Sequence, residues 1–491
     1  MTQELPPMEK PSNFGAAAVQ TFATTPRPDD PYRYQTGWGN RFASEAVPGA
    51  LPESGRNLPQ RCAYDLYPEQ FNGTSFIHVR SSMLNVWFYR IRPSVAHSPM
   101  TPLPASRANP DLIACFQSHN DKVKFTPLSY EWGPLNPPAE NEKVTFIQGL
   151  KTIAGHGDPT TKEGLAVHQY MANTSMGNQA FCNNDGDFLI VPQTGRLDIQ
   201  TESGRIMVRP GELCVIQAGL RFTVSLPDGV SNGYVQEIFG SHYELPDLGP
   251  LGTSGLALPR DFEYPIASFD MDTSTWEIVI KLAGELYCYE QPGTPFDVVS
   301  WHGNYVPYKY EIEKLVTVVC SMKEQLDPSA YCILQAKSKI QGVSLTEFCA
   351  FTPKWLVAFD TIRPPYYHRT MATEMMGLIH GTYGGSAKIL KPGGLTCDNS
   401  YVAHGESYKA WQAAITEEQT PKLASAGTVS FMMHMSSHLA MTKFATERHE
   451  NPYPPRKGFW DDFKGDFFNH VPEINKNLSS LGLPNLGKGS V

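Results

Sequence analysis

The sequence lacks several features that would assign it to a specialised class. It has no apolar run approaching the roughly 18 residues that a membrane-spanning helix requires, and it has no long basic run. With a formal net charge of -9, these absences argue against both a membrane protein and a nucleic-acid partner. Residues 1–29 lack the charged start and apolar middle of a signal peptide, so we expect a cytoplasmic protein.

Closely spaced cysteine pairs, which could bind a metal or act in redox chemistry, are also missing. The nine cysteines include no C-x-x-C motif, which predicts reduced, mostly buried thiols. Glycine and proline are plentiful, at 40 and 41 of 491 residues. This content favours many short strands joined by tight turns over long helices.

The clearest strand pattern lies between residues 188 and 239, where short apolar or alternating runs are separated by Gly- and Pro-containing turns. Such spacing is typical of a β-sandwich or jelly roll. The expected strands are 188–191, 197–200, 205–208, 213–216 and 222–226. The rhythm resembles a cupin, but Gln200 and Arg221 stand where metal-binding cupins carry histidines. We therefore expect this first sandwich to be structural.

The length predicts two domains. We expect a mainly β, cupin-like protein with a large N-terminal sandwich at 31–292 and a smaller domain at 293–475 that carries the functional site. Flexible tails are expected at 1–30 and 476–491. Further strands are expected at 84–91, 296–299 and 315–320, and helices at 407–414 and 460–468.

Three histidines and a glutamate gather between residues 363 and 404: His368, Glu374, His380 and His404. They are sufficient for a 2-His-1-carboxylate iron site, which leaves coordination positions open for substrate and dioxygen. His368 and Glu374 are six residues apart, which is roughly 20 Å on a straight strand and about 600° of rotation on a helix. They can share a metal only if the chain bends at 370–373. Glu374 and His380 are also six residues apart, so spacing alone does not decide which two histidines would be ligands. The alternative to a metal site is an ordinary His–Glu pair on the surface.

Five motifs carry a wider resemblance. They are DGDFLIVPQ at 185–193, ELPDLGP at 244–250, WHGNY at 301–305, PYKY at 307–310 and RPPYYHR at 363–369. In this order they resemble the homogentisate 1,2-dioxygenase family, and the resemblance extends over about residues 34–439. It implies an Fe(II)-dependent enzyme that opens the ring of homogentisate (2,5-dihydroxyphenylacetate) to maleylacetoacetate in tyrosine and phenylalanine catabolism. It also implies a cytosolic hexamer built as a dimer of trimers.

The resemblance also assigns roles to residues. It implies that the iron ligands are His368, Glu374 and His404, and that His302 is the catalytic histidine. A histidine beside a phenolic oxygen can accept and return a proton near neutral pH. Tyr383 and His404 are expected to contact substrate. Arg369 is expected to meet a carboxylate or to hold Glu374 in place, with an ordinary surface arginine as the alternative.

One departure concerns the substrate. Asp398 stands where the family usually has a histidine, six residues before the last ligand. An acidic residue there is expected to repel a ring carboxylate, so another para-hydroquinone, such as a methoxyhydroquinone, is an alternative substrate. A non-catalytic cupin-like protein and a metal-dependent cupin isomerase are further alternatives. His434 and His438 are expected to share a strand face, where a second metal is an alternative; His380 is expected to be an ordinary polar residue.

Overall fold

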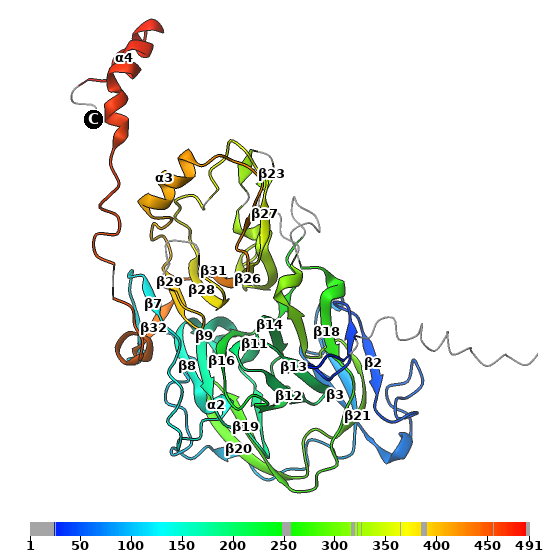
Figure 1. The fold of residues 1–491 in the computed structure, drawn as a ribbon. Coiled ribbons are helices and arrows are strands. Elements are labelled where there is room, and N and C mark those ends of the chain that lie inside the picture. Colours follow the sequence, from blue (N-terminus) through cyan, green and yellow to red (C-terminus); the bar gives the residue numbers. More distant parts are fainter. Residues whose placement is uncertain are drawn as a thin grey trace, which may run out of the picture.

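The computed structural model of the protein describes residues 24, 26–247, 257–315, 320–321, 323–325, 327–363, 365–383, 390–454 and 456–487. The strand expected at 315–320 lies largely outside these residues. The described chain is mainly β, which confirms the predicted class (Figure 1). No helix among these residues is long and apolar enough to cross a membrane.

Two large sheets form most of the first part of the chain, and β32 adds one strand from near the C-terminus. In spatial order, the ten-stranded sheet contains β1 (Tyr34–Thr36), β18 (Phe262–Pro265), β22 (Tyr308–Glu311), β14 (Glu212–Ile216), β11 (Gly186–Thr194), β16 (Ser231–Phe239), β9 (Glu163–Ala172), β8 (Leu150–Asp158), β32 (Ala440–Thr442) and β6 (Val123–Phe125). The facing seven-stranded sheet contains β13 (Gly204–Val208), β12 (Leu197–Thr201), β15 (Arg221–Ser225), β10 (Gln179–Asn183), β19 (Thr275–Leu282), β20 (Glu285–Pro292) and β5 (Thr101–Pro102). All five strands predicted between 188 and 226 are confirmed.

The core between these sheets explains the alternating sequence pattern. Phe181 of β10 and Phe188 of β11 stack across it, with ring centroids 6.0 Å apart. Successive side chains of a strand point to opposite faces, so Ile199, Ile206 and Val224 also enter this core, and each is at most 1% exposed. The predicted sandwich is therefore confirmed.

A smaller four-stranded sheet lies beside this sandwich. It contains β2 (Phe42–Glu45), β21 (Val298–Gly303), β4 (Asn85–Arg90) and β3 (Tyr67–Asn72), in that order. The strand predicted at 84–91 is confirmed as β4. Because β21 and β22 pair with strands of the first part of the chain, residues 298–311 are built into its sheets; the domain boundary at residue 292 stays a prediction.

The second seven-stranded sheet belongs mostly to the C-terminal part of the chain. It contains β17 (Tyr243–Glu244), β25 (Cys332–Lys337), β26 (Ser344–Phe351), β31 (Val429–Met435), β28 (Thr373–His380), β29 (Leu395–Asp398) and β7 (Tyr130–Trp132). Two short pairs complete the strands, β23 (Cys320–Ser321) with β24 (Glu324–Gln325) and β27 (Lys354–Leu356) with β30 (Lys422–Ala424).

One face of this C-terminal sheet packs on the first part of the molecule. The Phe431 ring lies 4.8 Å from the Tyr234 ring of β16, and the Tyr234 hydroxyl donates to the Gly394 carbonyl oxygen at 2.8 Å. At Gly377 on β28, an added Cβ would lie 2.2 Å from the Phe431 ring, so the close packing requires glycine. The opposite face of the sheet carries the side chains of Glu374 and Asp398, which are described below.

Helices are short. The α-helices are α2 (Phe146–Gly149), α3 (Tyr408–Thr416) and α4 (Val471–Ser480); the single-turn helices are η1 (Ala63–Asp65), η2 (Arg80–Ser82), η3 (Pro159–Thr161), η5 (Pro259–Asp261), η6 (Ile312–Lys314), η7 (Pro328–Tyr331), η8 (Phe444–Arg448) and η9 (Asp466–His470). The helix predicted at 407–414 is confirmed as α3, which Ser407 caps by accepting from the Ala410 amide. The helix predicted at 460–468 is wrong over most of its length, because residues 460–465 are turns and irregular chain and only 466–468 belong to the single-turn helix η9. The α-helix of this region, α4, starts at Val471 and accommodates Pro472 in its first turn.

Both predicted tails differ from the described chain. Asp30 is buried, and its carboxylate lies 2.5 Å from Lys309 Nζ, so the ordered body begins before residue 31. At the other end, residues 476–480 complete α4. In Figure 1 this helix projects away from the sheets.

Candidate metal centre

Two loops and one strand bring His368, Glu374 and His404 together. His368 and His404 form an isolated antiparallel bridge, in which the His368 amide donates to the His404 carbonyl oxygen at 3.1 Å and the reverse bond measures 3.2 Å. Their ring centroids lie 4.2 Å apart. Glu374 is the second residue of β28. The chain thus bends between His368 and Glu374, as the six-residue spacing requires.

The donor atoms converge. Glu374 Oε1 lies 3.5 Å from His368 Nε2, and Glu374 Oε2 lies 3.3 Å from His404 Nε2. One donor atom from each residue lies within 4.8 Å of the other two. Each Nδ1 is 2.9 Å from a backbone carbonyl oxygen, that of Tyr366 for His368 and that of Val402 for His404. Since a carbonyl only accepts, each Nδ1–H donates outward and each Nε2 points to the shared centre, the arrangement usual for metal-binding histidines.

The charges of the three groups depend on one another. Burial favours a raised pKa for Glu374, but hydrogen bonds from His368 and His404 outweigh it and lower this pKa to about 2. Burial favours a lowered pKa for His404, but the Glu374 hydrogen bond and the nearby Asp398 raise it to about 9. The pKa of His368 is raised chiefly by its hydrogen bond to Glu374. Without metal the Glu374 carboxylate is therefore charged beside a protonated His404 imidazole, and a divalent ion would displace that proton. Two imidazoles and a carboxylate of this kind fit Fe(II).

The other histidines of this region lie apart from these three. His380, at the far end of β28, is exposed, and its Nδ1 lies 3.2 Å from the Gly427 carbonyl oxygen. His434 lies on β31 with its Nδ1 3.8 Å from Glu347 Oε2. His438 lies beyond the end of β31, so the prediction that it shares a strand face with His434 is wrong.

Among the described residues, only one other cluster has donor atoms close enough to hold a metal: Asp30, Glu212 and Glu263. Their oxygens lie 2.5, 3.1 and 3.5 Å from Lys309 Nζ. Arg209 also pairs with Glu212 at 2.8 Å and Lys314 with Glu263 at 3.3 Å. Three cations therefore already balance the three carboxylates, and this cluster is a structural ion-pair group.

Asp398 and Glu374 lie side by side on the outer face of the C-terminal sheet. Glu374 is in register with Asp398 on β29 and with His434 on β31. Directly paired residues on neighbouring strands point to the same face. Together with Glu347 of β26, which pairs with His434, they form a polar row across four strands.

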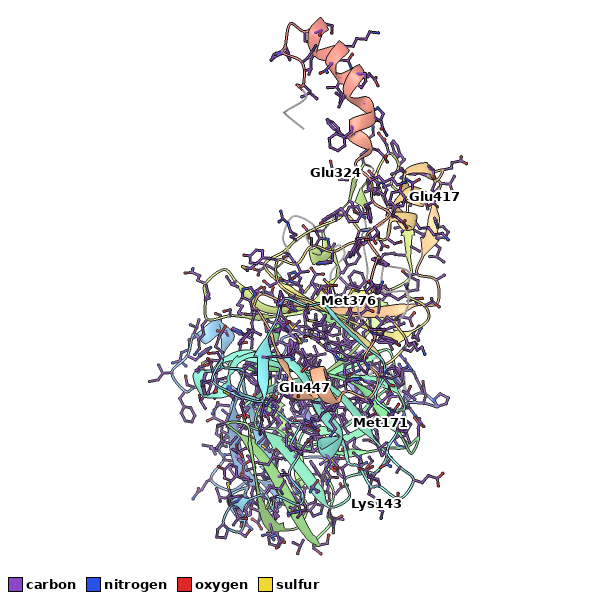
Figure 2. All side chains as sticks on the ribbon, turned by 90° about the vertical axis from the view of Figure 1, so that its left-hand side faces the viewer. Lys143, Met171, Glu324, Met376, Glu417 and Glu447 are labelled. Atoms are coloured by element: carbon purple, nitrogen blue, oxygen red, sulfur yellow. The ribbon has the colours of Figure 1, made fainter. Side chains whose placement is uncertain are left out.

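Tyr383 is close to this acidic group. Its hydroxyl donates to Met376 Sδ at 3.0 Å, and Met376 lies between the upper part of the molecule and the larger body in Figure 2. The pKa of Tyr383 is raised by burial and then by the charges of Glu406, Asp398 and Glu374. Met376 and Glu406 were not singled out from the sequence. The sequence signal that could have identified them is spacing: Met376 is two residues after Glu374, and Glu406 is two residues after His404. On a strand, the first spacing places Met376 on the same face as Glu374.

The remaining predicted site residues are not brought to the three donors. The Arg369 side chain is exposed and forms no ion pair within the described part of the chain. His302 lies on β21, in the four-stranded sheet, and Figure 1 shows β21 well apart from β28. Its Nε2 lies 3.1 Å from the Tyr89 hydroxyl oxygen, and burial followed by the charge of Arg41 lowers its pKa.

Comparisons with known proteins cover most of the chain. The family models described as homogentisate 1,2-dioxygenase N-terminal and C-terminal match residues 33–312 and 313–467. The homogentisate 1,2-dioxygenase of Arabidopsis thaliana is 46% identical over 405 residues, covering 82% of this chain and 86% of the relative. The human enzyme is 42% identical over 418 residues, covering 84% and 92%. Among solved structures, a cupin 2 conserved barrel domain protein from Leptotrichia buccalis matches with a TM-score of 0.25 and 10% identity, covering 63% of this chain and 92% of that one.

Proposed function

Because the chain belongs to the homogentisate 1,2-dioxygenase family, we propose that it binds Fe(II) through His368, Glu374 and His404 and opens the ring of homogentisate with dioxygen to give maleylacetoacetate. The convergence of these three side chains, with both Nε2 atoms turned inward, carries the proposal. Bound Fe(II) supplies coordination positions at which a ring oxygen and dioxygen can meet.

We infer that Tyr383 orients the ring. In the structure its hydroxyl donates to the Met376 thioether sulfur, which is a weak acceptor. A phenolate or hydroxyl oxygen of the substrate is a better acceptor, so the hydroxyl can turn to it at little cost. Because the pKa of Tyr383 is raised, the hydroxyl keeps its proton and acts as a donor.

We assign proton transfer to His302. The Tyr89 hydroxyl donates to the Asn57 carbonyl oxygen at 3.0 Å, so His302 Nε2–H donates to the Tyr89 oxygen and Nδ1 is the basic nitrogen. The lowered pKa keeps the imidazole neutral and able to accept a phenolic proton. A general base must come within about 2.6–3.2 Å of that proton. Since β21 lies apart from β28 in one chain, we infer that His302 serves the iron site of a neighbouring subunit, in agreement with the predicted hexamer and dimer of trimers.

A second substrate class is favoured by Asp398, which lies in register with Glu374 on the same sheet face. With Glu406 nearby, it makes this side of the site acidic. A ring carboxylate facing it would be repelled, whereas a neutral methoxyhydroquinone would not. We place either reaction in aromatic catabolism in the cytoplasm, with homogentisate implying tyrosine and phenylalanine breakdown.

The test is oxygen uptake by the Fe(II)-loaded protein with homogentisate, gentisate, methoxyhydroquinone and catechol. Rapid uptake with homogentisate supports the proposed reaction. Uptake only with methoxyhydroquinone would move the protein to the second substrate class. Stoichiometric iron binding without uptake on any substrate would refute a ring-cleaving dioxygenase.

A further inference from the structure

Next to the metal centre, a set of four aromatic side chains joins the C-terminal segment to the loop that carries His368. We call Tyr367, Tyr408, Trp411 and Phe463 the aromatic clamp. We propose that Phe463 is a positioning residue of the metal centre, which acts by fixing Tyr367 and through it the two ligand loops. The proposal rests on the metal site of the proposed function.

Tyr367 contacts both ligand loops. It directly precedes His368 in the chain. Its ring also lies against the backbone of Gly405, the residue after His404, because a Cβ added to Gly405 would be 2.5 Å from Tyr367 Cδ1. Together with the His368–His404 bridge and the Tyr401 amide bond to the Thr370 carbonyl oxygen, this ring therefore limits how closely the two loops approach. Between the two ligand histidines themselves, the backbone contact is the single bridge.

Aromatic contacts hold the Tyr367 ring in place. The side chain is 42% exposed, so it is not fixed by burial in the core. Phe463 meets it edge-on, with ring centroids 5.6 Å apart, and Trp411 lies at 5.8 Å. The Tyr408 ring also meets Phe463, with ring centroids 5.3 Å apart. Aromatic pairs prefer particular ring arrangements, so these contacts fix the orientation of the Tyr367 ring more closely than an apolar contact alone would.

Phe463 is itself anchored through the segment before it. The Phe463 amide donates to the Trp460 carbonyl oxygen at 3.3 Å. Arg456 forms an ion pair with Glu131 of β7, and the Tyr453 amide donates to the Glu131 carbonyl oxygen at 2.9 Å. β7 in turn pairs with β29. The C-terminal segment is thus tied to the same sheet that carries Glu374, which lets Phe463 transmit the position of the sheet to the His368 loop.

The test is metal binding by the full-length, metal-free protein with Co(II) as the probe, by calorimetry and by the visible absorption of the bound ion. Outer partners of metal ligands change metal affinity by roughly 10–100-fold. We expect Phe463→Ala to weaken Co(II) binding about tenfold, Phe463→Tyr to restore it, and Trp411→Leu to weaken it in the same direction. The matched control is Phe467→Ala, an exposed ring of the same segment whose one aromatic partner within the described part of the chain is Phe468.

Hydrogen exchange of the His368 and His404 amides gives a second readout that needs no metal. Faster exchange in Phe463→Ala, absent in Phe467→Ala, supports the clamp. Unchanged Co(II) affinity and unchanged exchange in Phe463→Ala would overturn it, as would an equal loss in Phe467→Ala. If the wild-type protein binds no Co(II), the proposed function fails, and the exchange measurement still decides the clamp. If Phe463→Ala does not fold, Trp411→Leu supplies the same comparison.

Discussion

Replacing Glu374 by glutamine tests the charge arrangement of the metal centre. Glutamine keeps the size of the side chain but removes the charge that both imidazoles face. The pKa of Glu374 falls from 4.5 to about 2 in the fold. A lowering of this size corresponds to roughly 3 kcal/mol of interaction between the carboxylate and its surroundings. Because the side chain is only 9% exposed, solvent screening reduces this value little. We therefore expect Glu374→Gln to lower the free energy of unfolding of the metal-free protein by up to about 3 kcal/mol.

The pH dependence of the free energy of unfolding shows which charged groups cause this loss of stability. The lowered pKa of Glu374 contributes stability above about pH 4.5, which is lost as the pH falls through about 2. The raised pKa of His404 contributes stability that is complete below about pH 6.5 and is lost as the pH rises through about 9. Both contributions are present between about pH 4.5 and 6.5. The stability difference between wild type and variant should therefore be greatest there and should narrow at about pH 9.5.

The assay is urea unfolding of both metal-free proteins at about pH 6 and about pH 9.5, with Co(II) titration as a second measurement. We expect Co(II) affinity to fall more than about 100-fold, since a ligand is lost and not only an outer partner. Glu347→Gln is the matched control, because Glu347 lies on the same sheet face but is not one of the three donors. An equal stability difference at both pH values, or wild-type Co(II) affinity in Glu374→Gln, would refute the arrangement.

Three further predictions concern specificity, assembly and stability. Asp398→His should raise kcat/KM for homogentisate relative to methoxyhydroquinone by at least roughly tenfold, about 1.4 kcal/mol of relieved repulsion; an unchanged ratio would show that this position does not set specificity. His302→Gln and Glu374→Gln should each be inactive, but co-assembled subunits of the two should regain oxygen uptake if His302 serves a neighbour, and inactive mixtures would contradict that. Arg90→Met leaves three carboxylates without their buried partner, and it should lower the free energy of unfolding in urea by about 3–5 kcal/mol. Its control is Arg61→Met, in an exposed pair, which should change the free energy of unfolding by less than about 1 kcal/mol.

Local pattern was sufficient for much of the fold. The strand at 84–91 and the strands between 188 and 226 were predictable because alternation and turn residues act over a few positions, and Ser407 marked the start of α3. The failed helix at 460–468 shows the limit of such reasoning. Residues 460–465 are instead turns and irregular chain, in which the Phe463 ring packs against Tyr367 and Tyr408, and the α-helix of this region starts only at Val471.

The sequence by itself determined the residue types of the candidate metal centre and, through its similarity to a family, predicted which three of them are ligands. Only the tertiary structure decided that they meet, because the His368–His404 bridge joins loops some 36 residues apart and no local spacing encodes it. The structure also placed β21, the strand that carries His302, apart from β28 within one chain, and it placed Asp398 beside Glu374 through strand register. Both outcomes follow from long-range strand pairing, which depends on the packing of whole sheets and not on neighbouring residues.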